Sequence, residues 1–436
     1  MELVRVQVGR EWRDGEIANP VSQQISASRA NGRANHEEIH ASGKLIIGDV
    51  RDHMPALLRE YEGRIKLIYL DPPYLTGEKF SMRVRVGEGE WKSAKGTLEL
   101  PAFNDTKDRE AYIMMMRRVL ADSHKLLRED GMLFLHIDYR AHPYMRLLLD
   151  EIFGESNFLN EIIWVYQSGG RSTKYFSRKH DVILFYRKSA KYDFNLEEVM
   201  TAPNSPRSNH MRRHVDPDGR VYRSIRSNGR IYTYYDDDPV APSDVWNDLS
   251  HLQQRDPERT GYDTQKPLAL LDRIVKCASR PGELVFDPFA GSATTLEAAM
   301  RNGREFIGVE KCPLAMNIAR RRLFGGKFET AFEPFEGNPV CRASIAPGVG
   351  FYQITLEEFA LEPAICPREF KGLDAVDNWS VGYLREDGYH CMVDSVRRRR
   401  KPGLETTLAA PVYDGTLAMC VADVLGRSFY YRIVQS

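Results

Sequence analysis

The chain has 436 residues, enough for two or three domains with a full hydrophobic core. Its 61 Lys and Arg residues are balanced by 61 Asp and Glu residues, so net charge indicates no partner and any nucleic-acid surface must come from local clustering. The six cysteines show neither a CxxC pair nor the His/Cys spacing of a zinc site. The first residues lack the apolar core of a signal peptide, and no apolar run approaches membrane-spanning length. We therefore expect a soluble, cytoplasmic protein with no metal site and no membrane partner.

Residues 1–42 are polar and rich in small side chains, and we expect a loosely ordered arm there. From Lys44 onward, short apolar runs alternate with segments of helical periodicity. This alternation predicts an α/β sheet covered by helices on both faces. The expected strands are 44–50, 65–71, 131–138, 160–167 and 180–188, and the expected helices are a segment around 54–61, 106–128 and 142–152.

Between about residues 190 and 255 the apolar periodicity stops, and Arg, Asn, Pro, Tyr and Asp replace it. The periodicity then resumes, with a strand in 281–289, a helix at 292–302, a strand at 305–310 and a helix ending near Gly325. Short strand-like runs in the last hundred or so residues predict a small β-rich module. The expected organisation is an N-terminal arm (1–42), a main domain (43–330) with an insertion at about 190–255, and a C-terminal module (331–436).

The stretch LVFDPFAGSATT, residues 284–295, has the features of a nucleoside-binding turn. A strand ends at Asp287, Gly291 lets the backbone approach a ligand closely, and the helix start offers unpaired N–H donors. Nineteen positions after Gly291, Glu310 ends the next strand, a spacing suited to holding two ribose hydroxyls. The loop is neither GxGxxG nor a Walker A sequence, and Asp287 would repel a diphosphate. S-adenosylmethionine, a cationic nucleoside with an amino-acid tail, fits these acids better.

The stretch DPPY, residues 71–74, follows an apolar strand. Asp71 and the Pro72 carbonyl offer two hydrogen-bond acceptors, the prolines stiffen the turn, and Tyr74 offers an aromatic face. Together they suit a planar base whose exocyclic amino group has its lone pair delocalised into the ring. Binding its N–H groups would localise that lone pair toward a methyl donor, and stacking on Tyr74 would contribute roughly 1–3 kcal/mol. Catalysis would then rest on positioning and electrostatics rather than on a strong base.

DPPY together with DPFAGSATT resembles the amino-group DNA methyltransferases. The first motif precedes the second by 216 residues (287 minus 71), an inverted order similar to the β group of that family, as in Type III modification subunits and solitary adenine methyltransferases. The resemblance continues through 166–188, 244–248 and 264–282, and covers roughly residues 43 to 325. It implies a Rossmann-like S-adenosylmethionine-dependent methyltransferase sheet in permuted motif order, with an inserted target-recognition region. Aspartate in the catalytic motif resembles the adenine-N6 members, whereas serine there is more usual of cytosine-N4 enzymes.

The same resemblance divides the site between a flipped base and the cofactor. Asp71, Pro72, Pro73 and Tyr74 would hold the base. Asp49 would lie near the cofactor's adenine, and Thr264 and Lys266 near its methionine end. The residues expected to hold the cofactor are, in full, Asp49, Thr264, Lys266, Asp287, Phe289, Gly291, Ser292, Thr294 and Glu310. The family usually has glycine where this chain has Ala293, and we expect a negative φ there, as a helix start permits, with a small energetic cost.

A base inside a duplex cannot reach such a site, so the target must be flipped out or already single-stranded. Residues 206–235 contain seven arginines against two aspartates, interleaved with tyrosines, a composition that suits phosphates, guanine edges and stacking. A second basic cluster precedes the strand near 181. We predict DNA contacts for Arg171, Lys174, Arg178, Lys179, Arg212, Arg213, Arg223, Arg226 and Arg230. The arginine run in 396–403 is as consistent with a solvated charged face as with phosphate contacts.

The sequence therefore predicts a site-specific DNA methyltransferase that acts on adenine N6 with S-adenosylmethionine. Two alternatives stay open: an enzyme for cytosine N4 in DNA or for adenine in RNA, and a non-catalytic DNA-binding subunit, for which Ala293 is the one hint. DNA is the expected partner, and a homodimer and a restriction subunit on a separate chain are left open. The sequence contains no helicase or nuclease motif, so cleavage would need that other chain.

Overall fold

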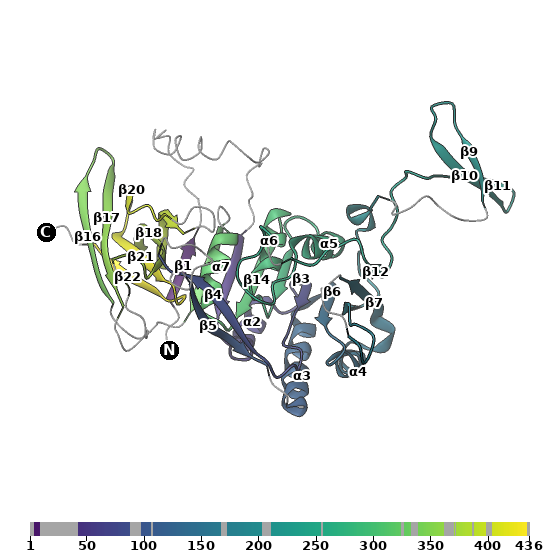
Figure 1. Cartoon of the computed structure of the whole chain (residues 1–436), viewed down its shortest axis with the longest axis horizontal. Coiled ribbons are helices and arrows are strands. Elements are labelled where there is room, and N and C mark those ends of the chain that lie inside the picture. The colour runs from purple at the N-terminus through teal and green to yellow at the C-terminus, as the bar shows by residue number, and fades with distance from the viewer. Residues whose placement is uncertain are drawn as a thin grey trace.

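The structure is a computed structural model (Figure 1). It describes residues 4–8, 42–87, 97–105, 108–166, 172–202, 211–253, 256–323, 327–332, 339–361, 370, 372–385, 388–397 and 403–433. Within these residues, no helix is long and apolar enough to cross a membrane.

One sheet of 14 strands runs through the protein. In spatial order its strands are β12 (Val245–Trp246), β7 (Phe158–Val165), β8 (His180–Arg187), β6 (Leu127–Ile137), β3 (Ile65–Leu70), β13 (Leu284–Asp287), β14 (Glu305–Glu310), β2 (Ser42–Ile47), β15 (Lys327–Phe332), β1 (Val4–Val8), β19 (Gly388–Val396), β18 (Val376–Arg385), β21 (Thr416–Asp423) and β22 (Ser428–Arg432). The strands from β6 to β15 are all parallel to one another. Such a parallel sheet must be covered on both faces, because its strands carry apolar side chains on each side.

Helices cover the two faces of the parallel strands. These helices are α2 (Val50–Tyr61), α3 (Arg109–Leu126), α4 (His142–Phe153), α5 (Leu268–Ala278), α6 (Thr294–Arg301) and α7 (Leu314–Arg322), with 3-10 turns η1 (Glu155–Asn157) and η2 (Leu196–Val199). Helices α5 to α7 pack on one face, where β3 contributes Leu67 and Tyr69. Helices α2 to α4 pack on the other, where β3 contributes Ile68 and Leu70. Full burial of such an apolar side chain contributes roughly 1.5–3 kcal/mol.

The predicted fold class, a Rossmann-like α/β sheet with permuted motif order, is confirmed. Strand β14 has the predicted bounds, 305–310, and β3 pairs with β13 although the two are far apart in sequence. The predicted segments at 142–152 and 292–302 are helices α4 and α6. The reason for the agreement is local, since hydrophobic periodicity and turn residues determine where each element begins and ends.

Several elements were not expected from the sequence, helix α5 among them. Residues 4–8, expected to belong to a loosely ordered arm, form β1, which pairs with β15 and β19. The alternation of valine with polar residues in VRVQV is a strand pattern; residues 9–41 lie outside the described part. A hairpin of β4 (Lys79–Arg85) and β5 (Thr97–Asn104), which the sequence did not suggest, follows the DPPY turn.

Beyond residue 330 the chain adds strands to the same sheet and also forms a second one. Strands β19, β18, β21 and β22 extend it beyond β1. Their outer part packs against a second sheet of β16 (Val340–Pro347), β17 (Phe351–Ala360) and β20 (Thr407–Pro411) around a core that includes Trp379. The β-rich character of this region agrees with the sequence, and its division from the main domain near residue 330 stays a prediction.

The segment without apolar periodicity carries a small sheet of its own. Strands β9 (Arg212–Val215), β10 (Val221–Ser227) and β11 (Arg230–Tyr235) pair antiparallel in the order β11-β10-β9. Figure 1 shows this sheet projecting from the body of the protein, at the end opposite the C-terminal strands.

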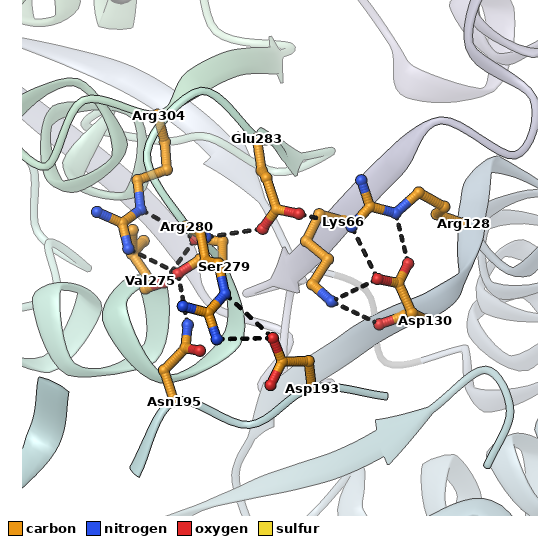
Figure 2. Close-up of polar contacts among 10 residues, drawn as sticks. All are labelled: Lys66, Arg128, Asp130, Asp193, Asn195, Val275, Ser279, Arg280, Glu283 and Arg304. Atoms are coloured by element: carbon orange, nitrogen blue, oxygen red, sulfur yellow. Dashed lines mark hydrogen bonds and ion pairs between the residues drawn. The ribbon is translucent and has the colours of Figure 1, made fainter. Parts of the chain in front are cut away.

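The amino-terminal edge of the parallel strands is tied together by ion pairs, drawn in Figure 2. Lys66, at the start of β3, contacts Asp130 at 3.0 Å, and Arg128 contacts both Asp130 and Glu283. Arg280 pairs with Asp193 at 2.8 Å. Each of these three cations has a carboxylate partner, which indicates a structural role for this edge.

Candidate active site

The opposite edge of the same strands carries a row of acids. Strands β6, β3, β13, β14 and β2 are adjacent and parallel, and each has an acid at its last position or within two residues beyond it. In spatial order these acids are Asp138, Asp71, Asp287, Glu310 and Asp49. Because the carboxyl edge of an open α/β sheet is where ligands bind, the two sequence motifs meet where a ligand site is expected.

Asp71 is the centre of a three-residue cluster. The Tyr74 hydroxyl donates to its Oδ1 at 2.5 Å, and Lys266 Nζ donates to its Oδ2 at 2.5 Å. Burial and the nearby Asp71 charge raise the pKa of Tyr74 well above its ordinary value, so its hydroxyl stays protonated and able to donate. Lys266 Nζ also lies over the Tyr74 ring, 5.2 Å from its centroid. The resemblance placed Lys266 at the methionine end of the cofactor, whereas here its ammonium contacts the Asp71 carboxylate.

The turn after Asp71 is held by a buried acid that the sequence did not single out. Asp105 accepts hydrogen bonds from the backbone N–H groups of Tyr74 and Thr76, at 3.1 and 2.7 Å, and from the Thr76 hydroxyl at 2.8 Å. Pro72 is buried and Pro73 half-buried within the same turn. These contacts fix the backbone on which the Tyr74 ring is carried.

The cofactor-type loop is closed by Glu310. Its Oε2 accepts from the Gly291 N–H and its Oε1 from the Cys312 N–H, both at 2.7 Å. Gly291 has a φ of +49°, a left-handed conformation that costs glycine little. The next strand therefore holds the loop through the carboxylate that was expected to bind ribose, and the remaining lone pairs of that carboxylate are available to a ligand.

Asp287 is buried at the end of β13, beside the loop. Its Oδ1 accepts from the Phe289 N–H at 2.9 Å. Burial raises its pKa to about 7, and the charges of Asp71 and Glu310 act in the same direction. Burial also raises the pKa of Glu310. A cationic ligand would favour the ionised form of both carboxylates.

The expectation for Ala293 was wrong. Its φ is +59° and its ψ is +30°, the left-handed region, whereas a negative φ was expected. Ala293 is the N-cap of α6 and lies outside the helix, so the negative φ of a helical residue does not apply to it. Alanine in this conformation costs roughly 1–2 kcal/mol relative to a right-handed one.

The other residues expected at the cofactor lie around this loop. The hydroxyls of Ser292 and Thr294 hydrogen-bond at 3.0 Å, and Thr264 is half-buried in the segment that leads to Lys266. Asp49 lies at the edge as expected, but its carboxylate accepts from Arg51 and Lys311. Those hydrogen bonds hold the pKa of Asp49 below its usual range.

A buried hydrogen-bond network lies next to Tyr74, and the sequence did not predict it. The Tyr69 hydroxyl contacts His136 Nδ1 at 2.9 Å, and His136 Nε2 contacts Asp181 at 3.2 Å. The His136 ring stacks on Tyr74 with centroids 6.3 Å apart, and the Tyr166 hydroxyl donates to Asp181 at 3.0 Å. A polar His136 inside an apolar strand was the signal that could have found it, since a buried polar group needs a partner.

The predicted DNA-binding residues fall in two places. Lys174 and Arg178 are exposed just before β8, and the Arg178 guanidinium lies 4.1 Å from the Tyr139 ring centroid. Because Tyr139 directly follows Asp138, Arg178 lies close to the row of acids. Lys179 accepts a backbone hydrogen bond from Tyr166, and Arg171 lies outside the described residues.

The remaining arginines belong to the projecting sheet. Arg212, Arg213, Arg226 and Arg230 are exposed. Arg223 differs from them, because it pairs with Asp236 at 3.1 Å and its side chain is 14% exposed. Its contact is therefore internal to the sheet. The arginine run in 396–403 falls largely outside the described residues.

Comparisons with known proteins identify the family of the chain. Residues 65–321, more than half of the chain, match the N6_N4_Mtase family, described as DNA methylase. The chain is 29% identical over 310 residues to the Type II methyltransferase M.EcaI of Enterobacter cloacae (61% of this chain and 66% of that protein). It is 28% identical over 261 residues to the DNA adenine methyltransferase YhdJ of Escherichia coli (59% and 76%). A putative DNA modification methylase from Thermus thermophilus, solved with S-adenosyl-L-methionine, is 20% identical with a TM-score of 0.41 (67% of this chain and 100% of that one). The chain thus spans about two thirds of the length of M.EcaI.

Proposed function

The chain belongs to the N6_N4_Mtase family of DNA methylases, and from that premise we propose that it transfers a methyl group from S-adenosylmethionine to the N6 amino group of adenine in DNA. The observation that carries the proposal is the contact of Asp71 with Tyr74, 2.5 Å apart, at the sheet edge that also carries Asp287 and Glu310. It supplies an acceptor for an amino group beside an aromatic face. The relative YhdJ is by name an adenine methyltransferase, which supports adenine over cytosine.

S-adenosylmethionine fits the residues around Gly291. Burial in that loop raises the pKa of Asp287 to about 7, and a bound cation would offset the cost of ionising it. Glu310 would accept from the ribose hydroxyls with the lone pairs that its bonds to Gly291 and Cys312 leave free. Phe289, Ser292 and Thr294 line the same loop, with Asp49 at the adenine end. When bound, the cofactor supplies an electrophilic methyl group on a sulfonium.

The residues of the chain prepare the amino group for that methyl group. Asp71 and the Pro72 carbonyl accept its two N–H bonds, so that its lone pair is directed out of the plane of the base. Tyr74 stacks on the base, worth roughly 1–3 kcal/mol, and Asp105 and His136 hold that ring in place. Asp71 also stabilises the positive charge that develops on the nitrogen, which is a contribution made only in the transition state.

Access to this site requires the target to leave the duplex. Exposed arginines on the projecting sheet and the exposed cations before β8 would bind the surrounding phosphates and base edges. The projecting sheet would then read sequence at a distance from the chemistry. A homodimer and a restriction subunit on a separate chain stay predictions.

The experiment that tests this function identifies the base that receives the methyl group. Purified protein is incubated with genomic DNA and labelled S-adenosylmethionine, and the nucleosides are analysed. We expect N6-methyladenine. Detection of N4-methylcytosine instead would show that the target base is cytosine.

Two variants then test the assignment of residues. Asp71→Ala should abolish transfer while cofactor binding survives. Glu310→Gln should weaken cofactor binding by at least about tenfold, because losing a hydrogen bond to a charged group costs roughly 1.5–3 kcal/mol, with turnover partly restored at saturating cofactor. Titration calorimetry of both variants measures their affinity for the cofactor. If both variants fold and lose cofactor binding equally, the assignment of Asp71 to the base and Glu310 to the cofactor is wrong.

A further inference from the structure

Lys266 occupies the space in which the target base would have to bind. Its Nζ is 2.5 Å from Asp71 Oδ2 and 5.2 Å from the Tyr74 ring centroid. The side chains of Lys266 and Asp71 are only 12% and 16% exposed. A base that donates its amino group to Asp71 and stacks on Tyr74 therefore cannot enter while the ammonium stays there.

The ammonium also opposes the chemistry. Methyl transfer places a positive charge on the amino nitrogen, and Asp71 can stabilise that charge only if it is not already neutralised by a neighbouring cation. Two cations at the same carboxylate would repel each other in a site that is shielded from water. For both reasons Lys266 must leave Asp71 before transfer.

The segment that carries Lys266 links the two halves of the site. Gln265 is buried and anchored, since its Oε1 accepts from the Thr260 N–H at 2.8 Å and its Nε2 donates to the Glu258 carbonyl at 2.9 Å. On the other side, the Tyr262 ring lies 3.5 Å from the position that a Cβ on Gly291 would take. The backbone at Lys266 is thus held beside the cofactor loop, while its four-carbon side chain is free to turn.

The carboxylate of the cofactor needs a cationic partner at this edge, because the acids there would repel it. Asp138, Asp71, Asp287, Glu310 and Asp49 would all repel it. Among the described cations there, Arg140 pairs with Asp138, Arg51 and Lys311 pair with Asp49, and Arg178 lies over the Tyr139 ring. Lys266 is the cation placed between Asp71 and the Gly291 loop, and it is the one that the carboxylate can reach from that loop.

We propose that Lys266 holds the place of the target base until S-adenosylmethionine binds, and that the carboxylate of the cofactor then draws the ammonium away from Asp71. The inference rests on the proposed function and adds an order of events to it, with the cofactor before the base. Because coupling between two binding events is reciprocal, a bound base also strengthens cofactor binding. Lys266 is in this sense a positioning residue, which acts through Asp71.

The test follows base flipping in the absence of turnover. A duplex that contains the recognition site, found by sequencing methylated bases, carries 2-aminopurine at the target adenine, whose fluorescence rises when it leaves the stack. The probes are S-adenosylhomocysteine, which has the carboxylate but no transferable methyl group, and its decarboxylated analogue, which keeps the amino group. For the wild-type protein, S-adenosylhomocysteine should raise the fluorescence at least fivefold over the analogue, with both at saturation.

Two variants of Lys266 and one control give the contrast. Lys266→Met and Lys266→Gln should flip the base without any cofactor, and their preference for S-adenosylhomocysteine over the analogue, measured by calorimetry, should fall about tenfold. Lys276→Met, ten positions further along and paired with Asp272 on α5, should behave as the wild type. A merely structural lysine would not produce flipping without cofactor.

The outcomes separate this inference from the function on which it rests. If the wild-type protein forms no methylated base on any DNA, the proposed function fails. If it methylates DNA but flips the base equally well without cofactor, or if both Lys266 variants still need S-adenosylhomocysteine, then Lys266 does not hold the place of the base.

Discussion

Ala293 is the residue at which the cofactor loop meets backbone strain. It is fully buried, with a φ of +59° directly before α6. A methyl group there adds apolar contact, but the backbone has a conformation that favours glycine. The strained residue lies one position from Ser292 and two from Gly291, so the strain is stored in the loop that would bind the nucleoside.

We expect Ala293→Gly to leave the free energy of unfolding unchanged within about 1 kcal/mol, because relief of roughly 1–2 kcal/mol of strain offsets the loss of about 0.8 kcal/mol of methyl burial. Ala299→Gly is the matched control, equally buried but inside α6. It should lose about 2 kcal/mol, from helix propensity and the same methyl group. Denaturant unfolding measures both, and equal losses would show that the left-handed conformation costs nothing.

Asp287 predicts a pH dependence of cofactor binding. Its folded pKa of about 7 lies above the ordinary value of 3.8, so this group stabilises the folded protein less as pH rises between those values. A cationic cofactor reverses the preference and favours the carboxylate. At pH 6 only about a tenth of such groups are ionised in the free protein, so binding should strengthen about tenfold from pH 6 to pH 8.

Calorimetry in two buffers of different ionisation enthalpy measures the effect. Close to one proton should be released on cofactor binding at pH 6 and almost none at pH 8. Asp287→Asn should bind more weakly at pH 8 and lose this pH dependence. An unchanged profile in Asp287→Asn would assign the released proton to another group.

At the scale of the element, the projecting sheet of β9 to β11 combines two kinds of arginine. Arg226 is exposed and lies opposite Ile231, which is 63% exposed. Arg223 is engaged with Asp236, and the Tyr222 ring lies between His214 and Tyr235 on the other face of β10. The internal contacts give the sheet its shape, while the exposed arginines are free to contact DNA.

Replacing these two arginines should therefore have different consequences. Arg226→Ala should lower the slope of log affinity against log salt by about one unit if it contacts a phosphate, or relax one position of the recognition site if it contacts a base. Arg223→Ala should instead speed hydrogen exchange in β10, because Asp236 loses its partner. DNA titrations at several salt concentrations and hydrogen-exchange mass spectrometry distinguish the two variants. If Arg226→Ala leaves both the salt slope and the specificity unaltered, Arg226 does not contact DNA.

At the scale of the whole molecule, the two edges of one sheet differ in how their charged side chains are paired. The amino-terminal edge carries Lys66, Arg128, Asp130 and Glu283 in mutually compensating pairs (Figure 2). The carboxyl edge carries five acids on adjacent strands. Two of them, Asp287 and Glu310, have no cationic partner among the described residues, and a cationic ligand would compensate them. The projecting sheet and the C-terminal strands lie at opposite ends of the molecule (Figure 1), so a DNA contact on the projecting sheet would leave the C-terminal strands away from it.

The sequence by itself determined most strands and helices of the parallel sheet, and the two motifs. Hydrophobic periodicity, Gly and Pro positions and the DPPY and DPFAGS turns are local properties, and β14 accordingly has its predicted bounds. It also placed Asp71 and Asp287 at strand ends, because a strand's end can be read from the chain around it. The short β1 was missed although VRVQV alternates, because a strand of five residues needs partners to be recognised. The β4–β5 hairpin was missed as well.

Only the tertiary structure decided which of these residues meet. Lys266 contacts Asp71 across 195 positions, and His136 and Asp181 flank Tyr74 from two further strands. Such contacts depend on strand order and register, which no local pattern contains. The left-handed φ of Ala293 and the pairing of Arg223 with Asp236 likewise appear only in the folded structure. Hydrophobic periodicity can be read from neighbouring residues, whereas the candidate active site depends on distances between segments that are far apart in the sequence.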